Sequence, residues 1–180
     1  MKNLILFLIV VSFACCSCSF YNGLNGTVVD NATGQPLEGA LVVVQWTKPR
    51  GIPGLQYRDL HKIAETLTDK QGAFSIDGTI GFLLDPPEML IYKDGYIPWR
   101  NDMDFPGGHR NKDNEWKHNI TYRLDIFTDK YTYRQLYHFL DTGMMGNSRK
   151  EVPMSSKLMR DISMREKAEI RTQMQKNNKP

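Results

Sequence analysis

Histidine is the residue type in this chain best suited to catalysis or metal binding, but its spacing supports neither role. None of the four histidines is followed three positions later by Glu, as a His-x-x-Glu zinc pair requires; they are His61, His109, His118 and His138. His138 and Asp141 stand one helical turn apart and could ligate a metal, but a pair of surface residues is the simpler interpretation. Because the chain also lacks a nucleophile-elbow motif and a phosphate-binding loop, it predicts no catalytic residue, metal or cofactor.

A second candidate is a run of carboxylates in the segment 101–117. The four acidic residues of this segment are Asp102, Asp104, Asp113 and Glu115. Loop carboxylates can hold calcium, but the spacing matches no calcium loop and nearby Arg and Lys residues dilute the charge. A solvated loop is therefore favoured. The alternative function that this region leaves open is a metal- or His-dependent hydrolase that uses His109 and His118.

The cysteines carry the third kind of chemistry, and all three lie near the N-terminus, at Cys15, Cys16 and Cys18. They follow one positive residue and an apolar run, Leu4 to Ala14, that is too short for a typical spanning helix. A secretory signal that ends in a Cys among small residues resembles a bacterial lipoprotein signal. That resemblance implies lipidation at Cys18, with Cys15 and Cys16 as alternatives. The other interpretations are an ordinary cleaved signal with incidental cysteines and, less favoured, an N-terminal membrane anchor that is never cleaved.

The elements that must position any site are best seen at "LTDKQGAFSIDG". Asp69 can accept hydrogen bonds from amides two residues further on, and Gly72 can adopt the positive φ that closes a tight hairpin. The alternation that follows places Phe74 and Ile76 on one face of a strand. We expect both to be buried against Val42 and Val44, and against Leu90 or Tyr92.

Other turn residues divide the chain into short strands with no helix between them. Strands are predicted over 26–30, 40–47, 89–92 and 118–127, and extended structure over 63–69, whereas the Pro- and Gly-rich segment 48–62 is predicted to be an exposed loop. The residues assigned to turns and core are Gly34, Pro36, Gly39, Asp69, Gly72, Phe74, Ile76, Gly95 and Tyr96. This pattern is typical of an antiparallel β-sandwich.

After residue 128 the pattern changes to helical. Asp129 is a plausible N-cap for a helix with an apolar face, and Gly143 is a plausible stop. Further along, Lys157 to Pro180 holds seven Lys/Arg against three Asp/Glu, a net charge of +4, while the whole chain of 180 residues carries only +3. Its apolar stripe is ragged, so we expect a solvated helix that contributes little core and becomes disordered at Asn177. It either touches an acidic surface or has no partner.

Three blocks in order, "GTVVDNATGQPLEGALVVV", "TLTDKQGAFSI" and "MLIYKDGYIPW", resemble the carboxypeptidase regulatory-like domain. The resemblance covers roughly residues 24–127. It implies a seven-stranded antiparallel, transthyretin-like β-sandwich, here followed by a C-terminal α-helical extension. The expected organisation is a lipoprotein-type signal peptide over 1–18, the sandwich over 22–127, and a helical, partly disordered basic tail over 128–180.

In that family the module is usually non-catalytic, and this sets the expected function. We predict a cell-envelope lipoprotein module that binds a protein, a peptide or cell-wall material. It would be attached to the membrane through its N-terminal lipid, at an outer membrane facing the periplasm or the exterior. The small net charge gives no indication of nucleic acid as a partner.

Overall fold

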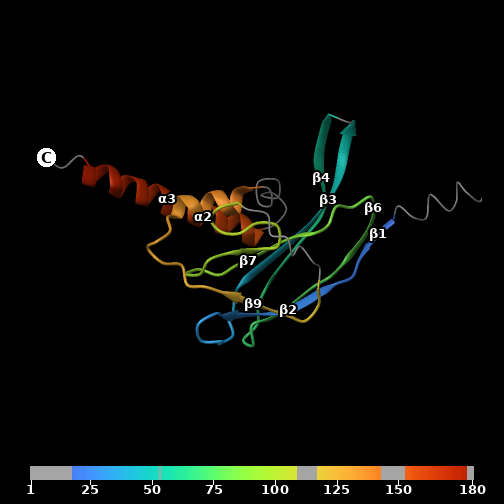
Figure 1. The fold of residues 1–180 in the computed structure, drawn as a ribbon, viewed down its shortest axis with the longest axis horizontal. Coiled ribbons are helices and arrows are strands. Elements are labelled where there is room, and N and C mark those ends of the chain that lie inside the picture. Colours follow the sequence, from blue (N-terminus) through green and yellow to red (C-terminus); the bar gives the residue numbers. More distant parts are fainter. Residues whose placement is uncertain (1–17, 53, 109–116, 143–152, 178–180) are drawn as a thin grey trace, which may run out of the picture.

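The computed structural model describes residues 18–52, 54–108, 117–142 and 153–177. They form β-sheets followed by two C-terminal helices, so the prediction of a mainly β protein with a helical extension is confirmed (Figure 1). The helices are α2 (Tyr133–Leu140) and α3 (Pro153–Asn177).

Two sheets make up the body of the fold. The larger one has the strand order β4-β3-β7-β8, made of Leu55–Leu67, Leu41–Ile52, Glu88–Tyr92 and Trp99–Arg100. The smaller one has the order β5-β2-β9, made of Ala73–Ile76, Leu24–Asp30 and Ile120–Leu124. A separate two-stranded ribbon pairs β1 (Cys18–Tyr21) with β6 (Thr79–Phe82).

One strand pair departs from the expected antiparallel arrangement. Strands β2 and β9 run parallel, in a register from Gly26 opposite Ile120 to Asp30 opposite Leu124. A parallel pair needs a long connection, and almost ninety residues separate these two strands along the chain. The antiparallel prediction was therefore wrong for this pair, because local alternation reveals a strand but not the direction of its neighbour.

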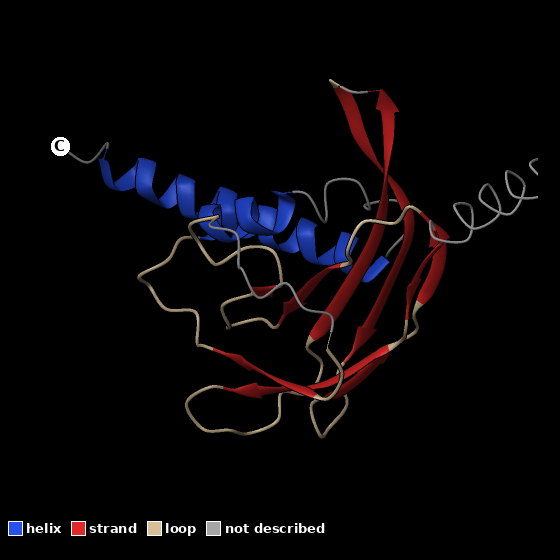
Figure 2. Cartoon of the chain, turned by 45° about the vertical axis from the view of Figure 1, so that its right-hand side comes forward, coloured by secondary structure: helices blue, strands red, loops and turns tan. Residues whose placement is uncertain are grey.

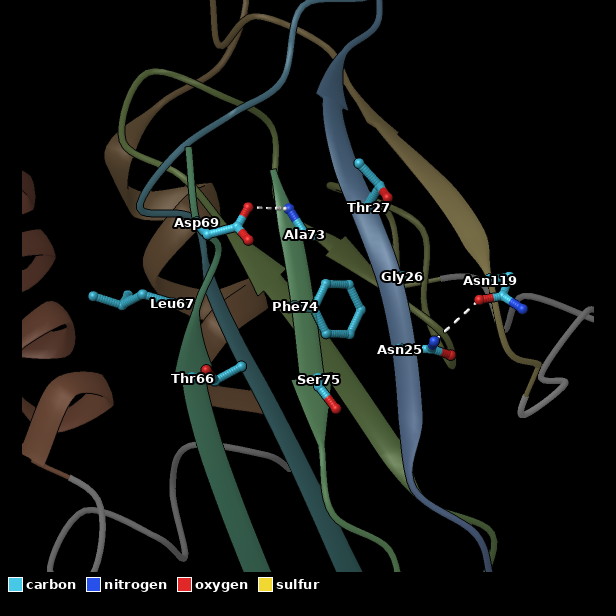
Figure 3. A pocket seen from close by; sticks show the side chains of 10 residues that line it. All are labelled: Asn25, Gly26, Thr27, Thr66, Leu67, Asp69, Ala73, Phe74, Ser75 and Asn119. Atoms are coloured by element: carbon cyan, nitrogen blue, oxygen red, sulfur yellow. Dashed lines mark hydrogen bonds between the residues drawn. The ribbon is translucent and has the colours of Figure 1, made fainter. Parts of the chain in front are cut away.

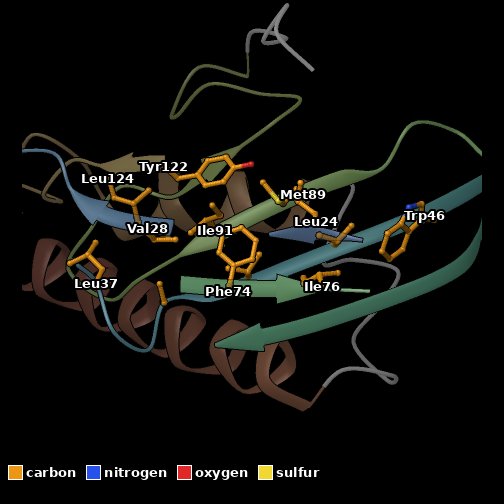
Figure 4. Close-up of a cluster of buried hydrophobic side chains, with 13 residues drawn as sticks. Leu24, Val28, Leu37, Trp46, Phe74, Ile76, Met89, Ile91, Tyr122 and Leu124 are labelled. Carbon is orange, nitrogen blue, oxygen red and sulfur yellow. The ribbon is translucent and has the colours of Figure 1, made fainter. Parts of the chain in front are cut away.

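The two sheets share a hydrophobic core, to which Phe74 and Ile76 contribute from β5 (Figure 4). Across from them lie Val42 and Val44 of β3, as expected. The prediction for β7 was wrong by one residue: Met89 and Ile91 face this core, and Leu90 and Tyr92 face the other way. Side chains alternate along a strand, so an error of one position exchanges the two faces.

The opposite face of the larger sheet is covered by the helices (Figure 2). This second core joins side chains of β3 and β7 to side chains of α2 and α3; its buried members are Leu41, Val43, Leu90, Tyr92, Leu136, Phe139, Leu140, Met159 and Ile162. The expectation that the basic tail contributes little core was therefore wrong for the first half of α3. From Arg165 onward the described helix is mostly exposed.

Helix α2 begins three residues later than the Asp129 prediction. Its N-cap is Thr132, whose hydroxyl accepts a hydrogen bond from the Gln135 amide at 3.2 Å. The Gln135 side chain in turn accepts from the Thr132 amide at 2.9 Å, which completes a capping box. The predicted stop, Gly143, lies outside the described residues.

The predicted loop over 48–62 is instead the outer part of a long β-hairpin. Strands β3 and β4 pair as far as Ile52 opposite Leu55, with a register shift after Trp46. Gly51 and Gly54 adopt φ of +95° and +90° and close the turn. Pro49 is tolerated because β7 pairs with β3 only up to Gln45, so Pro49 lies beyond the pairing with that neighbour.

Candidate functional site

The corner at Asp69 has a structural explanation. Its carboxylate accepts hydrogen bonds from the amides of Gln71 at 2.9 Å and Ala73 at 2.8 Å. Gly72 has φ of +71°, and a Cβ there would lie 2.4 Å from the carbonyl oxygen of Val28. The predicted hairpin is wrong here, because the corner carries the chain from β4 in the larger sheet to β5, which pairs with β2 in the smaller one. We assign Asp69 and Gly72 to the scaffold.

The remaining turn residues also serve the scaffold. Gly34, Gly39 and Gly95 have φ of +72°, +69° and +83°, which Cβ-bearing residues rarely adopt. Pro36 forms an isolated bridge to Val29. Tyr96 donates a hydrogen bond from its hydroxyl to Asp30 at 3.0 Å, and so connects the turn after β7 to the end of β2.

A polar hollow of about 670 Å³ lies over the outer side of β2 and β5 (Figure 3). Its lining is rich in amides and hydroxyls, and Asn25 donates from Nδ2 to Oδ1 of Asn119 at 3.0 Å. Its one carboxylate, that of Asp69, is already engaged by the two turn amides. Neutral donors and acceptors of this kind can bind a polar group, but they offer neither a nucleophile with an adjacent base nor a metal ligand set.

The histidines do not converge in the described part of the chain. His118 places Nδ1 3.2 Å from Oδ1 of Asn25, His138 lies in α2, and His61 lies in β4. His109 lies outside the described residues, together with Asp113 and Glu115 of the acidic segment. Among residues that are described, no three His, Cys, Asp or Glu side chains come close enough to hold a metal ion.

Two acidic residues of the segment 101–117 are described: Asp104 is exposed, and Asp102 has a structural partner. Asp102 accepts hydrogen bonds from the buried guanidinium of Arg100 at 2.8 and 2.7 Å. The same guanidinium donates to the carbonyl oxygen of Phe139 in α2 at 2.9 Å. Arg100 thereby joins β8 to the helical layer while Asp102 balances its charge, and we assign the pair to stability.

Of the three cysteines, only Cys18 falls within the described residues, as the first residue of β1 opposite Phe82. Neither of the described helices is long and apolar enough to cross a membrane. The apolar run Leu4 to Ala14 precedes the described part of the chain.

The feature that the sequence analysis missed is an arm, the part of the β3–β4 hairpin from Thr47 to Leu60. It extends six residue pairs beyond the bulge after Trp46 and projects from the body (Figure 2). Ile52 and Leu55 are paired at its end, and Arg50 and Tyr57 are paired two positions closer to the body. Because the pairs alternate in facing, these four side chains share one face, which we call the arm face.

The arm face has an apolar end and a charged base. Ile52, Leu55 and Tyr57 are 64%, 75% and 63% exposed. Towards the body, Asp59 lies 3.4 Å from Nε of Arg50 and 3.9 Å from Nζ of Lys48. The signal that could have revealed the arm was the alternation of apolar and polar residues over 55–58, directly after Gly54.

Comparisons with known proteins give only a distant structural resemblance. No family model and no curated protein sequence matches the chain. The streptococcal ancillary pilin is 15% identical with a TM-score of 0.31, and the match covers 59% of this chain and 29% of that one. The group B streptococcus pilus 2b backbone protein is 16% identical with a TM-score of 0.34, and the match covers 61% and 42%.

The shaft pilin of Lactobacillus rhamnosus GG is similar at the same level, with 15% identity, a TM-score of 0.31, and coverage of 61% and 48%. The chain therefore spans less than half the length of each of these pilins. At such TM-scores and identities we take no functional property from them.

Proposed function

We propose that this protein is a non-catalytic cell-envelope module that binds another envelope protein through the arm face. It is held at the membrane, on the periplasmic or outer side, by lipid at Cys18. The single observation that carries the binding role is the arm itself, a hairpin that leaves the body and exposes three large apolar or aromatic side chains at its end.

The arrangement of the arm face supports a protein as partner. Protein interfaces combine an apolar centre containing aromatic side chains and Arg with a charged rim, and the arm places Tyr57 and Arg50 beside Ile52 and Leu55. Lys48 and Asp59 supply the rim. The exposed apolar side chains at the end of the arm do not stabilise the isolated chain, because they are not buried. Exposed apolar patches mark interaction sites in soluble domains.

The arm is also held in a defined direction, which lowers the entropy lost on binding. Arg58, on the other face of the arm, donates to Glu88 and lies with Nε 3.7 Å from Asp85. These contacts fix the arm to β7 and to the loop before it. A preorganised strand pair can dock without the cost of ordering a free loop.

The test is photo-crosslinking of the full-length protein in the cell envelope of the producing organism. A photoreactive residue replaces Tyr57 in one variant and Gln56 in a matched control, since Gln56 is exposed but points to the other face. We expect a specific adduct from position 57 only, and we expect Ile52→Asp to abolish it without lowering the melting temperature. Equal adducts from both positions, or none, would contradict a role for the arm face.

The attachment is tested separately by mass spectrometry of the mature N-terminus. The expected species begins at Cys18 and carries a thioether-linked diacylglyceryl group with an N-acyl chain, which together anchor a protein stably. A mature chain that begins beyond Cys18 without modification would contradict the anchor and leave the arm hypothesis to the crosslinking result.

A further inference from the structure

The ribbon formed by β1 and β6 has an unusual outer face. Neither strand contains a charged residue. Phe20 is paired with Ile80, and Phe82 lies two residues beyond Ile80, so all three side chains belong to one face. They are 64%, 59% and 60% exposed, although apolar residues of this size are usually turned inward.

The inner face of the ribbon explains why these side chains point outward. Tyr21 packs against the sandwich core, and Ser19 accepts a hydrogen bond from the Leu84 amide at 3.2 Å. Gly81 packs directly against the Leu84 side chain: a Cβ on Gly81 would lie only 2.8 Å from it. The body therefore fixes one face of the ribbon and leaves Phe20, Ile80 and Phe82 to solvent or to a partner.

The next residue along the chain adds to this surface. Leu83 has φ of +52° and is 54% exposed. A left-handed backbone is uncommon for any residue other than Gly and strains a Leu. Gly or Asn would adopt this backbone conformation with less strain than Leu83 does. The Leu83 side chain extends the exposed apolar surface beyond β6.

We infer that this face, defined by Phe20, Ile80, Phe82 and Leu83, lies in the interfacial region of a lipid bilayer. The inference rests on the proposed attachment of the N-terminus to a membrane and concerns a different surface from the arm face. The proposed lipid is attached at Cys18, which is the first residue of β1 and is paired with Phe82 of β6. A lipid on that residue therefore holds the ribbon at the membrane surface.

The chemistry of the face favours lipid over a second protein. The arm face has charged residues at its base, as a protein interface does, whereas the ribbon strands have none. Phenylalanine, leucine and isoleucine side chains insert into the boundary between headgroups and acyl chains, where burial of their apolar surface is favourable. The ribbon also lies at the edge of the molecule remote from the free end of α3 (Figure 1).

The test uses the full chain, extracted from bacterial membranes and reconstituted into phosphatidylcholine vesicles with or without brominated acyl chains. An indole is introduced by Phe20→Trp or Phe82→Trp. The matched controls are Ile126→Trp and Met174→Trp, whose native side chains are 55% and 61% exposed elsewhere on the molecule. Fluorescence of the parent chain is subtracted to remove the signals of Trp46, Trp99 and Trp116.

We expect brominated lipid to quench the indoles at positions 20 and 82 at least twofold more than those at 126 and 174. Equal quenching at all four positions in chains that sediment with the vesicles would overturn the ribbon inference and leave the proposed attachment intact. A parent chain that does not sediment with vesicles would overturn both. Crosslinking between two copies at position 82, without lipid quenching, would show that a second chain covers the face and would also overturn the inference.

Discussion

The two faces of the larger sheet are covered by different material, and neighbouring residues of β7 show the contrast. Ile91 and Leu90 are both fully buried, but Ile91 points into the core shared with the smaller sheet and Leu90 points into the helical layer. Central strands covered on both sides have continuous apolar runs, and β3 and β7 contain such runs in "LVVV" and "MLIY". A run without alternation therefore indicates that a second layer exists, although it does not say what the layer is.

The two layers also differ in how they are held. The sandwich core is apolar, whereas the helices are joined to the sheet by polar contacts as well. Glu65 of β4 accepts hydrogen bonds from the amides of Met154 and Ser155 at 3.0 and 3.2 Å, at the N-terminus of α3. Glu169 of α3 in turn accepts from the amide of Tyr133 at 3.0 Å, at the start of α2. Carboxylates at helix N-termini satisfy free amides and the helix dipole.

The largest effect is expected from removing α3 from the helical layer. Deletion of residues 153–180 removes Met159 and Ile162 from the second core, and full burial of two such side chains contributes about 3–6 kcal/mol. It also removes part of the cover from the β3 side chains of that core, Leu41 and Val43. We expect a large fall in the urea midpoint and binding of an apolar dye at neutral pH. An unchanged urea midpoint would mean that α3 is a dispensable tail and that the core under the helices contributes far less to stability than the core between the sheets.

Phe74 and Leu90 are buried in the two different cores, and truncation of either should destabilise the protein. Phe74→Ala should cost about 3–5 kcal/mol and Leu90→Ala about 2–5 kcal/mol, because both leave cavities in buried sites. The two differ in where the structure loosens. Hydrogen exchange of α3 amides should accelerate in Leu90→Ala but not in Phe74→Ala when the variants are compared under native conditions. Equal acceleration would show that the two cores unfold as one unit.

A smaller effect tests the polar attachment of α3. Glu65→Ala removes three contacts, since the carboxylate also lies 3.1 Å from the Ser155 hydroxyl, and loss of such a cap costs about 0.5–2 kcal/mol. Glu65→Gln keeps an acceptor oxygen and loses only the charge, so its cost should be smaller, about 0.3–1 kcal/mol. Urea unfolding at pH 7 measures both. If the two variants were equally stable, the charge alone would account for the contact.

The sequence predicted one layer well and the other poorly for identifiable reasons. The corner "TDKQG" and the alternation after it involve neighbours in the chain, so they indicate β5 and the burial of Phe74 and Ile76 directly. The packing of α3 depends on residues about ninety positions away, such as Glu65, and its apolar stripe is ragged because only its first half is covered. The arm was missed because Pro49 and two glycines suggest a loop, although pairing with a single neighbour tolerates them.

The smallest expected effect concerns an exposed ion pair that also joins the helical layer to the sheet side. Arg165 of α3 donates to both carboxylate oxygens of Asp94, one of them at 3.0 Å, and Tyr92 donates from its hydroxyl to Asp94 at 3.3 Å. The hydrogen bond from Arg165 is the main cause of an Asp94 pKa below its usual value. The two side chains are 42% and 60% exposed, so solvent screens the pair and its contribution is at most about 1 kcal/mol.

The pH dependence of this contribution has a definite sign. The pKa of Asp94 is lower in the folded protein than the ordinary value of about 3.9, so the stabilisation is present above that value and is lost as pH falls through the folded pKa. The difference in unfolding free energy between the parent and Asp94→Asn should therefore be constant from pH 7 to about pH 5 and disappear towards pH 2. Arg165→Gln should show the same profile, and 1 M salt should reduce both differences at pH 7. A difference in stability that persists at pH 2, or that salt does not change, would mean that Asp94 acts through its hydrogen bonds alone. The outer half of α3 would then be held by the packing of Arg165 on Tyr133, since the guanidinium lies 5.6 Å from the centre of that ring.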